Sequence, residues 1–242
     1  MTTDCIKDYP EFWGAVNDRA EKWGDFLKLT AEDTGMYSGN VGKCLRQLVI
    51  VRLKNFKWHP TRKQRGNMLI GSAMEEAFKK EILIPAGIFR GRNRVRVRAT
   101  AMSGETDAGI LDPLTKQKVI MECKCPNPYG YSPQVKEILA GNVRRDYLYQ
   151  LMSYLMYSNA AYGILCILSR ESLTLFRAFK VVRDKKIMAD IKFRCKAFSY
   201  CVKKKKYPQM ESGDFCQWCD VSDHCKRLPI HLTFRKLKKL VL

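Results

Sequence analysis

Two carboxylates and a lysine stand close together near the middle of the sequence. Asp107 lies in GETDAGI, and Glu122 and Lys124 lie in MECKCP. Between them, two short apolar runs flank residues 112–116, whose Asp-Pro-Leu-Thr-Lys sequence is typical of a turn between antiparallel strands. We therefore predict a hairpin with Asp107 near the beginning of one strand and Glu122 on its partner, so that the two carboxylates approach each other at one sheet edge.

This pattern suits a divalent metal ion. Side chains alternate across a strand, so Glu122 and Lys124 share one face while Cys123 points the other way and offers its main-chain carbonyl as a further ligand. Carboxylates, a carbonyl and water are the oxygen ligands that Mg²⁺ or Mn²⁺ prefers. Lys124 could then orient or deprotonate an attacking water and offset charge on a scissile phosphate. An isolated Glu-x-Lys is more typical of ordinary surface charges on a solvated hairpin. Whether it marks an active site therefore depends on the neighbouring elements.

The elements before the hairpin supply further carboxylates and basic residues. Residues 66–84 carry apolar side chains at helical spacing until Pro85-Ala86-Gly87, and Glu75 and Glu76 lie on this predicted helix. Residues 41–53 predict a short helix with Cys44 in its first turns. Residues 90–100 alternate basic residues with valines, which is typical of a strand with one basic face.

The elements after the hairpin would cover its sheet. Residues 134–159 are helical in pattern, with a break near Gly141-Asn142, and the second part carries Gln150 and Tyr154 one turn apart on one face. Two strands, 163–168 and 173–182, and a basic helix to about Lys206 follow. The last nine residues form a terminal helix or a mobile end. We expect an α/β fold with a central mixed sheet flanked by helices.

Composition indicates the partner. The 242 residues include 44 Lys and Arg against 24 Asp and Glu, a formal net charge of +20, which attracts polyanions such as nucleic acid. A basic surface that serves only solubility would give the same count. We predict one domain over 1–242 with its core at about 60–200. The sequence shows no export signal and no apolar run long enough to span a bilayer, so we expect a cytoplasmic protein with no membrane partner.

Several basic and aromatic residues could contact DNA. Tyr129 and Tyr131 could stack on unpaired bases or pack within their Pro-rich loop. The basic residues would contact phosphates without reading bases, although such runs are as typical of a solvated face. These basic residues are Arg90, Arg92, Arg94, Arg96, Arg98 and Lys203 to Lys206.

Ten cysteines in an intracellular protein indicate metal binding more than disulfides. Cys216, Cys219 and Cys225 are spaced closely enough to converge, and Cys44 is a distant candidate for a fourth ligand. Four thiolates bind zinc or an iron–sulfur cluster, and His224 could complete a zinc site instead. For the other six we expect reduced thiols with no ligand role.

From Ser38 to about Leu228 the sequence resembles the RecB-like branch of the PD-(D/E)XK nuclease superfamily. The motifs of that family fall on Asp107, on Glu122 and Lys124, and on Gln150 and Tyr154, which by this resemblance contact the DNA backbone and order the lysine. The family has a metal-binding histidine four residues after a glycine, and GSAMEEAF places Glu75 there. A carboxylate can still bind the cation, with Glu76 as the neighbour if the register shifts by one.

The placement of one cysteine before the core and three after it is similar to the iron–sulfur subgroup, which includes the CRISPR-associated "Cas-four" exonucleases and AddB-type nuclease domains. The resemblance implies a restriction-endonuclease-like core, a 4Fe-4S cluster on Cys44, Cys216, Cys219 and Cys225, and a clasp that joins Cys44 to residues 208–228 ahead of a basic tail, 229–242. It also implies an exonuclease acting on single-stranded DNA. Partners could be a second copy or proteins of recombination, replication or CRISPR-adaptation complexes.

Two other functions fit parts of the pattern. A non-catalytic nucleic-acid-binding module with a structural zinc or iron–sulfur site would have the same charge and cysteines, with incidental carboxylates. A redox protein would use its cluster for electron transfer, but the sequence has no resemblance to a nucleotide or flavin site. Metal-dependent cleavage separates the nuclease from both.

Overall fold

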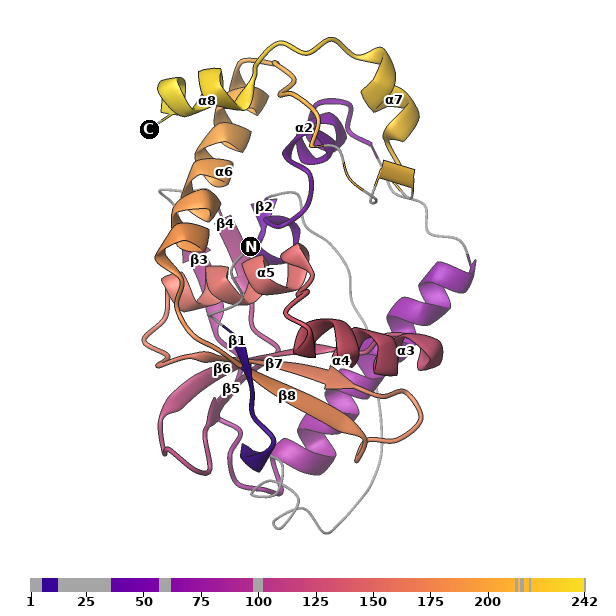
Figure 1. Cartoon of the computed structure of the whole chain (residues 1–242), viewed down its shortest axis with the longest axis vertical. Helices are drawn as coiled ribbons and strands as arrows, with labels where there is room; N and C mark the ends of the chain where they lie inside the picture. Colours follow the sequence, from indigo (N-terminus) through magenta and orange to yellow (C-terminus); the bar gives the residue numbers. More distant parts are fainter. Residues whose placement is uncertain are drawn as a thin grey trace.

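A computed structural model describes residues 6–12, 36–56, 62–97, 102–211, 213, 216–217 and 219–241. In these ranges the protein has an α/β fold, with a five-stranded sheet at one end and a group of helices at the other (Figure 1). The predicted fold class is thereby confirmed. The iron–sulfur clasp stays a prediction.

The main sheet is mixed, with strands in the order β1-β8-β7-β6-β5. β6 pairs parallel with β7, whereas the β5–β6, β7–β8 and β1–β8 pairs are antiparallel. The strands are β1 (Ile6–Asp8), β5 (Ala108–Leu111), β6 (Lys118–Lys124), β7 (Gly163–Leu168) and β8 (Phe176–Val181). β5 and β6 are the predicted hairpin, and the Asp112 carboxylate shapes its turn by accepting from the N–H groups of Leu114 and Thr115.

The two faces of this sheet bury different side chains. On β6, Val119 and Met121 pack into a core with α3 (Arg62–Phe78) and the π-helical turn η2 (Lys79–Leu83) that continues it. Ile120, between them, packs into a second core with helices of the opposite face. These are α4 (Tyr131–Leu139), α5 (Arg145–Met156) and α6 (Lys185–Lys203). Strand alternation therefore places Glu122 and Lys124 on the α5 face, as predicted.

A small second sheet precedes the hairpin, with strands in the order β2-β4-β3. Its strands are β2 (Met36–Tyr37), β3 (Arg94–Val97) and β4 (Met102–Glu105). β3 is shorter than the strand predicted over 90–100 because Gly91, at φ +101°, breaks the extended run before Arg94. Arg98 lies outside the described residues.

The predicted break at Gly141 separates α4 from α5, and Gly141 has φ +85°. The beginning of α5 also packs tightly against the segment around η1 (Ser38–Asn40). A Cβ atom on Gly42 would lie 2.5 Å from the Asp146 Cα, so only glycine allows this approach.

The far end of the molecule joins segments that are distant in sequence. α2 (Leu45–Leu53) contacts α7 (Ser222–Arg227), and α8 (Phe234–Val241) packs on α6 with Leu237 fully buried (Figure 1). The last residues thus form the terminal helix, one of the two predicted alternatives. Among the described residues, no helix combines the length and the apolarity needed to cross a membrane.

Candidate active site

Asp107 lies at the junction of the two sheets, between the end of β4 and the beginning of β5. Its Oδ2 atom accepts a hydrogen bond of 2.7 Å from the main-chain N–H of Cys123. This bond ties Asp107 to the end of β6, one residue from both Glu122 and Lys124. The Cys123 thiol points to the opposite face, where it is buried opposite Cys166.

Lys124 is held between two side chains. Its Nζ atom contacts Glu122 Oε1 and donates to Gln150 Oε1 at 3.1 Å. The Glu122 side chain is 1% exposed and that of Lys124 is 20% exposed. Lys124 is therefore the more exposed partner of a largely buried ion pair.

Gln150 and Tyr154 connect this lysine to the small sheet. Gln150 Nε2 donates to the Tyr154 hydroxyl at 3.3 Å, and that hydroxyl donates to the Glu105 carbonyl at 2.8 Å. The amide of Gln150 is thus oriented with its oxygen toward Lys124. Tyr154 is 2% exposed, so its position is fixed by the core as well as by these hydrogen bonds.

Glu75 on α3 approaches the group from the other side. Burial, followed by the charge of Asp107, raises the pKa of Glu75 to about 7, and Lys124 acts on it in the opposite direction. Glu75 Oε1 accepts from Arg92 at 3.1 Å. Glu76 points elsewhere, toward Lys79, Lys80 and Arg92. Glu75 rather than Glu76 lies beside Asp107.

The carboxylates repel one another in a poorly solvated place. Burial, then the charge of Asp107, raises the pKa of Glu122 to about 8. Burial likewise raises the pKa of Asp107, against the effect of Lys124. Burial alone would lower the pKa of Lys124, but the charges of Glu122 and Asp107 raise it above its usual value. Lys124 therefore keeps its positive charge, and the positive charge around the carboxylates is too small to keep all of them ionised.

The carboxylate oxygens of this group are ligands of the kind that a hard divalent cation prefers. Glu122 Oε2 is buried and has no hydrogen-bond partner among the described residues, which is a cost that a bound cation would relieve. In the same ranges, no group of three or more His, Cys, Asp or Glu side chains is arranged so that it could hold a metal ion. Oε1 of Glu122 instead contacts Lys124 and Oε1 of Glu75 contacts Arg92, so these side chains must rotate before both carboxylates can bind one cation.

The basic and aromatic candidates fall into two groups. Arg92 and Arg94 are paired with Glu75 and Glu105, which explains part of the charge pattern of residues 90–100 without DNA. Tyr129 is 92% exposed beyond the end of β6, whereas Tyr131 packs against the core. Lys203 to Lys206 lie at and beyond the end of α6. The side chain of Arg96 lies outside what the structure describes.

The four predicted cluster ligands lie near one another. Burial raises the pKa of Cys219, and the thiols of Cys44, Cys225 and Cys216 each raise it further, so all three are within electrostatic range of Cys219. Cys44 is the residue before α2, and Cys225 lies on α7. The ring of His224 lies at 6.2 Å from that of Phe56. The structure therefore places Cys44 near the C-terminal cysteines, but within the described ranges the four thiols are not arranged to hold a metal ion.

The sequence alone did not indicate two residues that organise these sites. Arg46 is fully buried and donates to four main-chain carbonyls and, at 3.2 Å, to Cys225 Sγ; the carbonyls belong to Pro208, Cys225, Leu228 and Pro229. Tyr147 lies one turn before Gln150, and its ring centroid is 5.3 Å from Lys124 Nζ. The three-residue spacing from Gln150 could have identified Tyr147. Nothing in the sequence distinguishes Arg46 from its basic neighbours.

Comparison with solved structures identifies relatives of this fold. An alkaline exonuclease from Laribacter hongkongensis matches with a TM-score of 0.52 and 16% identity, over 71% of this chain and 89% of that chain. The same enzyme in complex with dAMP matches with a TM-score of 0.50 and 14% identity, over 71% and 89%. A phage-related exonuclease from Haemophilus somnus 129PT matches with 0.51 and 16%, over 72% and 96%.

This chain shares the fold of these exonucleases. No protein-family model and no curated protein sequence matches it. The nuclease-like fold that the resemblance implied is thus supported by structure, at identities too low to carry over an activity.

Proposed function

We propose that this protein is a metal-dependent DNA nuclease, most specifically an exonuclease that hydrolyses single-stranded DNA. The observation that carries the proposal is the position of Lys124, held between buried Glu122 and Gln150 with Asp107 and Glu75 beside it. This group lies in a fold shared with solved exonucleases. The group concentrates buried charged side chains with shifted pKa values at one place, which is typical of active sites.

Each residue has a distinct part in the proposed reaction. Glu75, Asp107, Glu122 and the Cys123 carbonyl would hold Mg²⁺ or Mn²⁺, which supplies polarisation of the phosphate and a more acidic water. Lys124 orients the attacking water and offsets the negative charge that develops on the phosphate oxygens. Gln150 and Tyr154 fix the direction of the lysine, and Gln150 offers its amide to the DNA backbone.

Charge and relatives support DNA as the substrate. The net charge of +20 favours a polyanion. The Laribacter enzyme binds dAMP, a deoxynucleoside monophosphate. Proteins of DNA recombination, replication or CRISPR adaptation, or a second copy of the chain, are the partners that this activity would serve.

The nuclease proposal is tested with end-labelled linear single-stranded DNA and Mn²⁺. We expect the parent to shorten the DNA and Lys124→Met or Asp107→Asn to reduce the rate at least about a hundredfold. Lys118→Met, at the exposed beginning of the same strand, is the matched control and should cut like the parent. Unchanged cutting by Lys124→Met, or no cutting by the parent, would reject the enzyme in favour of a nucleic-acid-binding module.

We further propose that Cys44, Cys216, Cys219 and Cys225 hold a 4Fe-4S cluster that stabilises the fold. Their mutual proximity around Cys219 supports this, and such a group would contribute directly to folding free energy. Anaerobically purified protein should absorb in the visible range, and Cys216→Ala should be colourless and poorly soluble. A stable Cys216→Ala protein with the parent's visible spectrum would exclude the cluster, and a colourless parent containing zinc would replace iron with zinc.

A further inference from the structure

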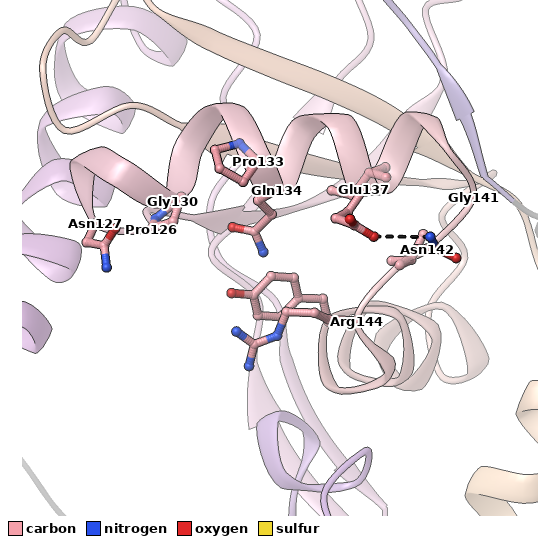
Figure 2. A pocket seen from close by; sticks show the side chains of 12 residues that line it. Pro126, Asn127, Gly130, Pro133, Gln134, Glu137, Gly141, Asn142 and Arg144 are labelled. Atoms are coloured by element: carbon pink, nitrogen blue, oxygen red, sulfur yellow. Dashed lines mark hydrogen bonds between the residues drawn. The ribbon is translucent and has the colours of Figure 1, made fainter. Parts of the chain in front are cut away.

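A hollow of about 750 Å³ lies between α4 and the beginning of α5, beyond the end of the catalytic strand. Its volume is that of a small-molecule site. Figure 2 shows the Gln134 amide pointing from α4 into this hollow, toward Arg144 on the opposite side. Asn127 borders the hollow where the chain leaves β6, and Asn142 borders it between the two helices.

The lining differs from the rest of this basic protein. Its one guanidinium, that of Arg144, is already paired with both oxygens of Asp146. The only carboxylate in the lining, Glu137, accepts from Asn142 at 3.1 Å. The remaining polar side chains are uncharged, and the amides of Asn127 and Gln134 make no hydrogen bond within the described ranges. A phosphate would meet a carboxylate and no unpaired cation here, so the lining does not suit an anion.

The same lining suits a flat, uncharged, hydrogen-bonding ligand. The Arg144 guanidinium lies over the Tyr147 ring, 4.5 Å from its centroid, so two planar groups stack on each other at the border of the hollow. Nucleobases stack on aromatic rings and guanidinium planes, and their edges pair with amides, which both donate and accept. Asn127 and Gln134 are amides of this kind at the border of the hollow.

One stripe of α5 connects this hollow to the proposed catalytic group. Tyr147, Gln150 and Tyr154 follow one another at three- and four-residue spacing, so they lie on one face of the helix. Tyr147 borders the hollow and also lies 5.3 Å from Lys124 Nζ, while Gln150 bonds that same lysine. A phosphate at Lys124 would therefore lie next to whatever occupies the hollow.

We propose that the hollow between α4 and α5 is a nucleobase subsite, which receives an unpaired base next to the scissile phosphate. The inference rests on the proposed function, because it takes the scissile phosphate to lie at Lys124. The subsite requires a base that is free of its Watson–Crick partner. It thus gives single-stranded DNA, or a frayed end, an advantage that charge alone would not give.

The test measures binding separately from cleavage. In the Lys124→Met background, with Ca²⁺, dissociation constants are measured by fluorescence anisotropy for single-stranded oligonucleotides that each carry one abasic residue at a different position. We expect an abasic residue at one position to weaken binding about tenfold. We expect Asn127→Ala/Gln134→Ala to weaken binding of the intact strand about tenfold, from two lost hydrogen bonds.

The decisive result is non-additivity. The double variant should have no further effect on the strand that is abasic at the sensitive position, and Gln117→Ala, an exposed amide in the β5–β6 turn, should have no effect on any strand. If the double variant weakens intact and abasic strands equally, or if no single base matters, the subsite is excluded. Cleavage by the parent is measured in parallel. If the parent cuts DNA but the double variant and the abasic residue act additively, the subsite alone is rejected. If their effects are non-additive but the parent does not cut, the nuclease alone is rejected.

Discussion

At the scale of single residues, the candidate site concentrates charge where burial makes it costly. Glu122 is fully buried, and a carboxylate there is stable only with a cation or a proton. Lys124 and Arg92 supply positive charge to these carboxylates, but burial together with mutual repulsion still raises the pKa of Glu122 to about 8 and that of Glu75 to about 7. The protein thus retains an unfavourable group of acids, which is expected if a cation completes it.

Glu75 and Glu76 provide a direct test of which residue binds that cation. Glu75→Gln should shift the Mn²⁺ dependence of DNA cleavage to at least about tenfold higher concentrations, because one of three carboxylate ligands loses its charge. Glu76→Gln should leave that dependence near the parent's, because Glu76 faces Lys79 and Lys80. The opposite order would show that the register of the helix motif is shifted by one.

The sequence could predict these residues only in part. Asp107, Glu122 and Lys124 stand near a hairpin whose turn residues are local, so their meeting could be expected from spacing. The closeness of Glu75 to Asp107 depends on where α3 packs, which spacing does not give. Tyr147 and Arg144 had no motif to mark them, and their role depends on the hollow that two helices create together.

At the scale of elements, local signals predicted the longer helices and the long strands but not α7, whereas contacts between distant segments decided the short strands. β1 and β2 have three and two residues and were not expected, because their strand pairing comes from β8 and β4 rather than from their own sequence. Asp107 directly precedes β5, near a strand beginning as expected, but spacing did not show that Gly104 and Glu105 belong to β4 of the other sheet.

The close contact between Gly42 and α5 should determine how α5 is oriented and therefore where it places its proposed catalytic side chains. Gly42→Ala would place its Cβ atom 2.5 Å from Asp146 Cα and 2.8 Å from the Arg145 carbonyl, so main-chain atoms must shift. We expect a loss of about 2 kcal/mol in the free energy of unfolding and a larger relative loss in cleavage than in DNA binding, since α5 carries Gln150. Gly213→Ala, where an added Cβ meets no atom within 4 Å, is the control. Equal stability of the two variants would contradict the close approach.

At the scale of the whole molecule, largely buried charged side chains hold the C-terminal segment against helices from earlier in the chain. Glu211 accepts from the N–H of Leu45 and pairs with Arg145 and Arg194, which joins the C-terminal segment to three helices. Arg46 gives the same segment five hydrogen bonds from α2. This polar framework therefore holds α2 against the C-terminal segment that carries three of the cysteines.

Arg46→Met should show how much of the stability resides in this framework. The change removes the donor of four buried or half-buried main-chain carbonyls, and we expect a loss of about 3 kcal/mol or more in the free energy of unfolding. Urea unfolding should show a lower midpoint with an unchanged slope. Arg46→Lys should recover only part of the loss because an ammonium cannot reach all four acceptors. Lys54→Met, at the exposed end of α2, should match the parent, and a parent-like Arg46→Met would show that the framework is dispensable.

β1 also has a consequence for how molecules meet one another. A strand at the border of a sheet presents unpaired N–H and C=O groups, which recruit strands of other chains. β1 occupies those groups of β8, and the pairing continues where the N–H of Tyr9 donates to the Ala178 carbonyl at 3.1 Å. The ion pair of Asp8 with Arg177 places charge along the same border. This border of the sheet that carries the proposed active site is thus a strand of only three residues, which leaves little length for edge-to-edge self-association.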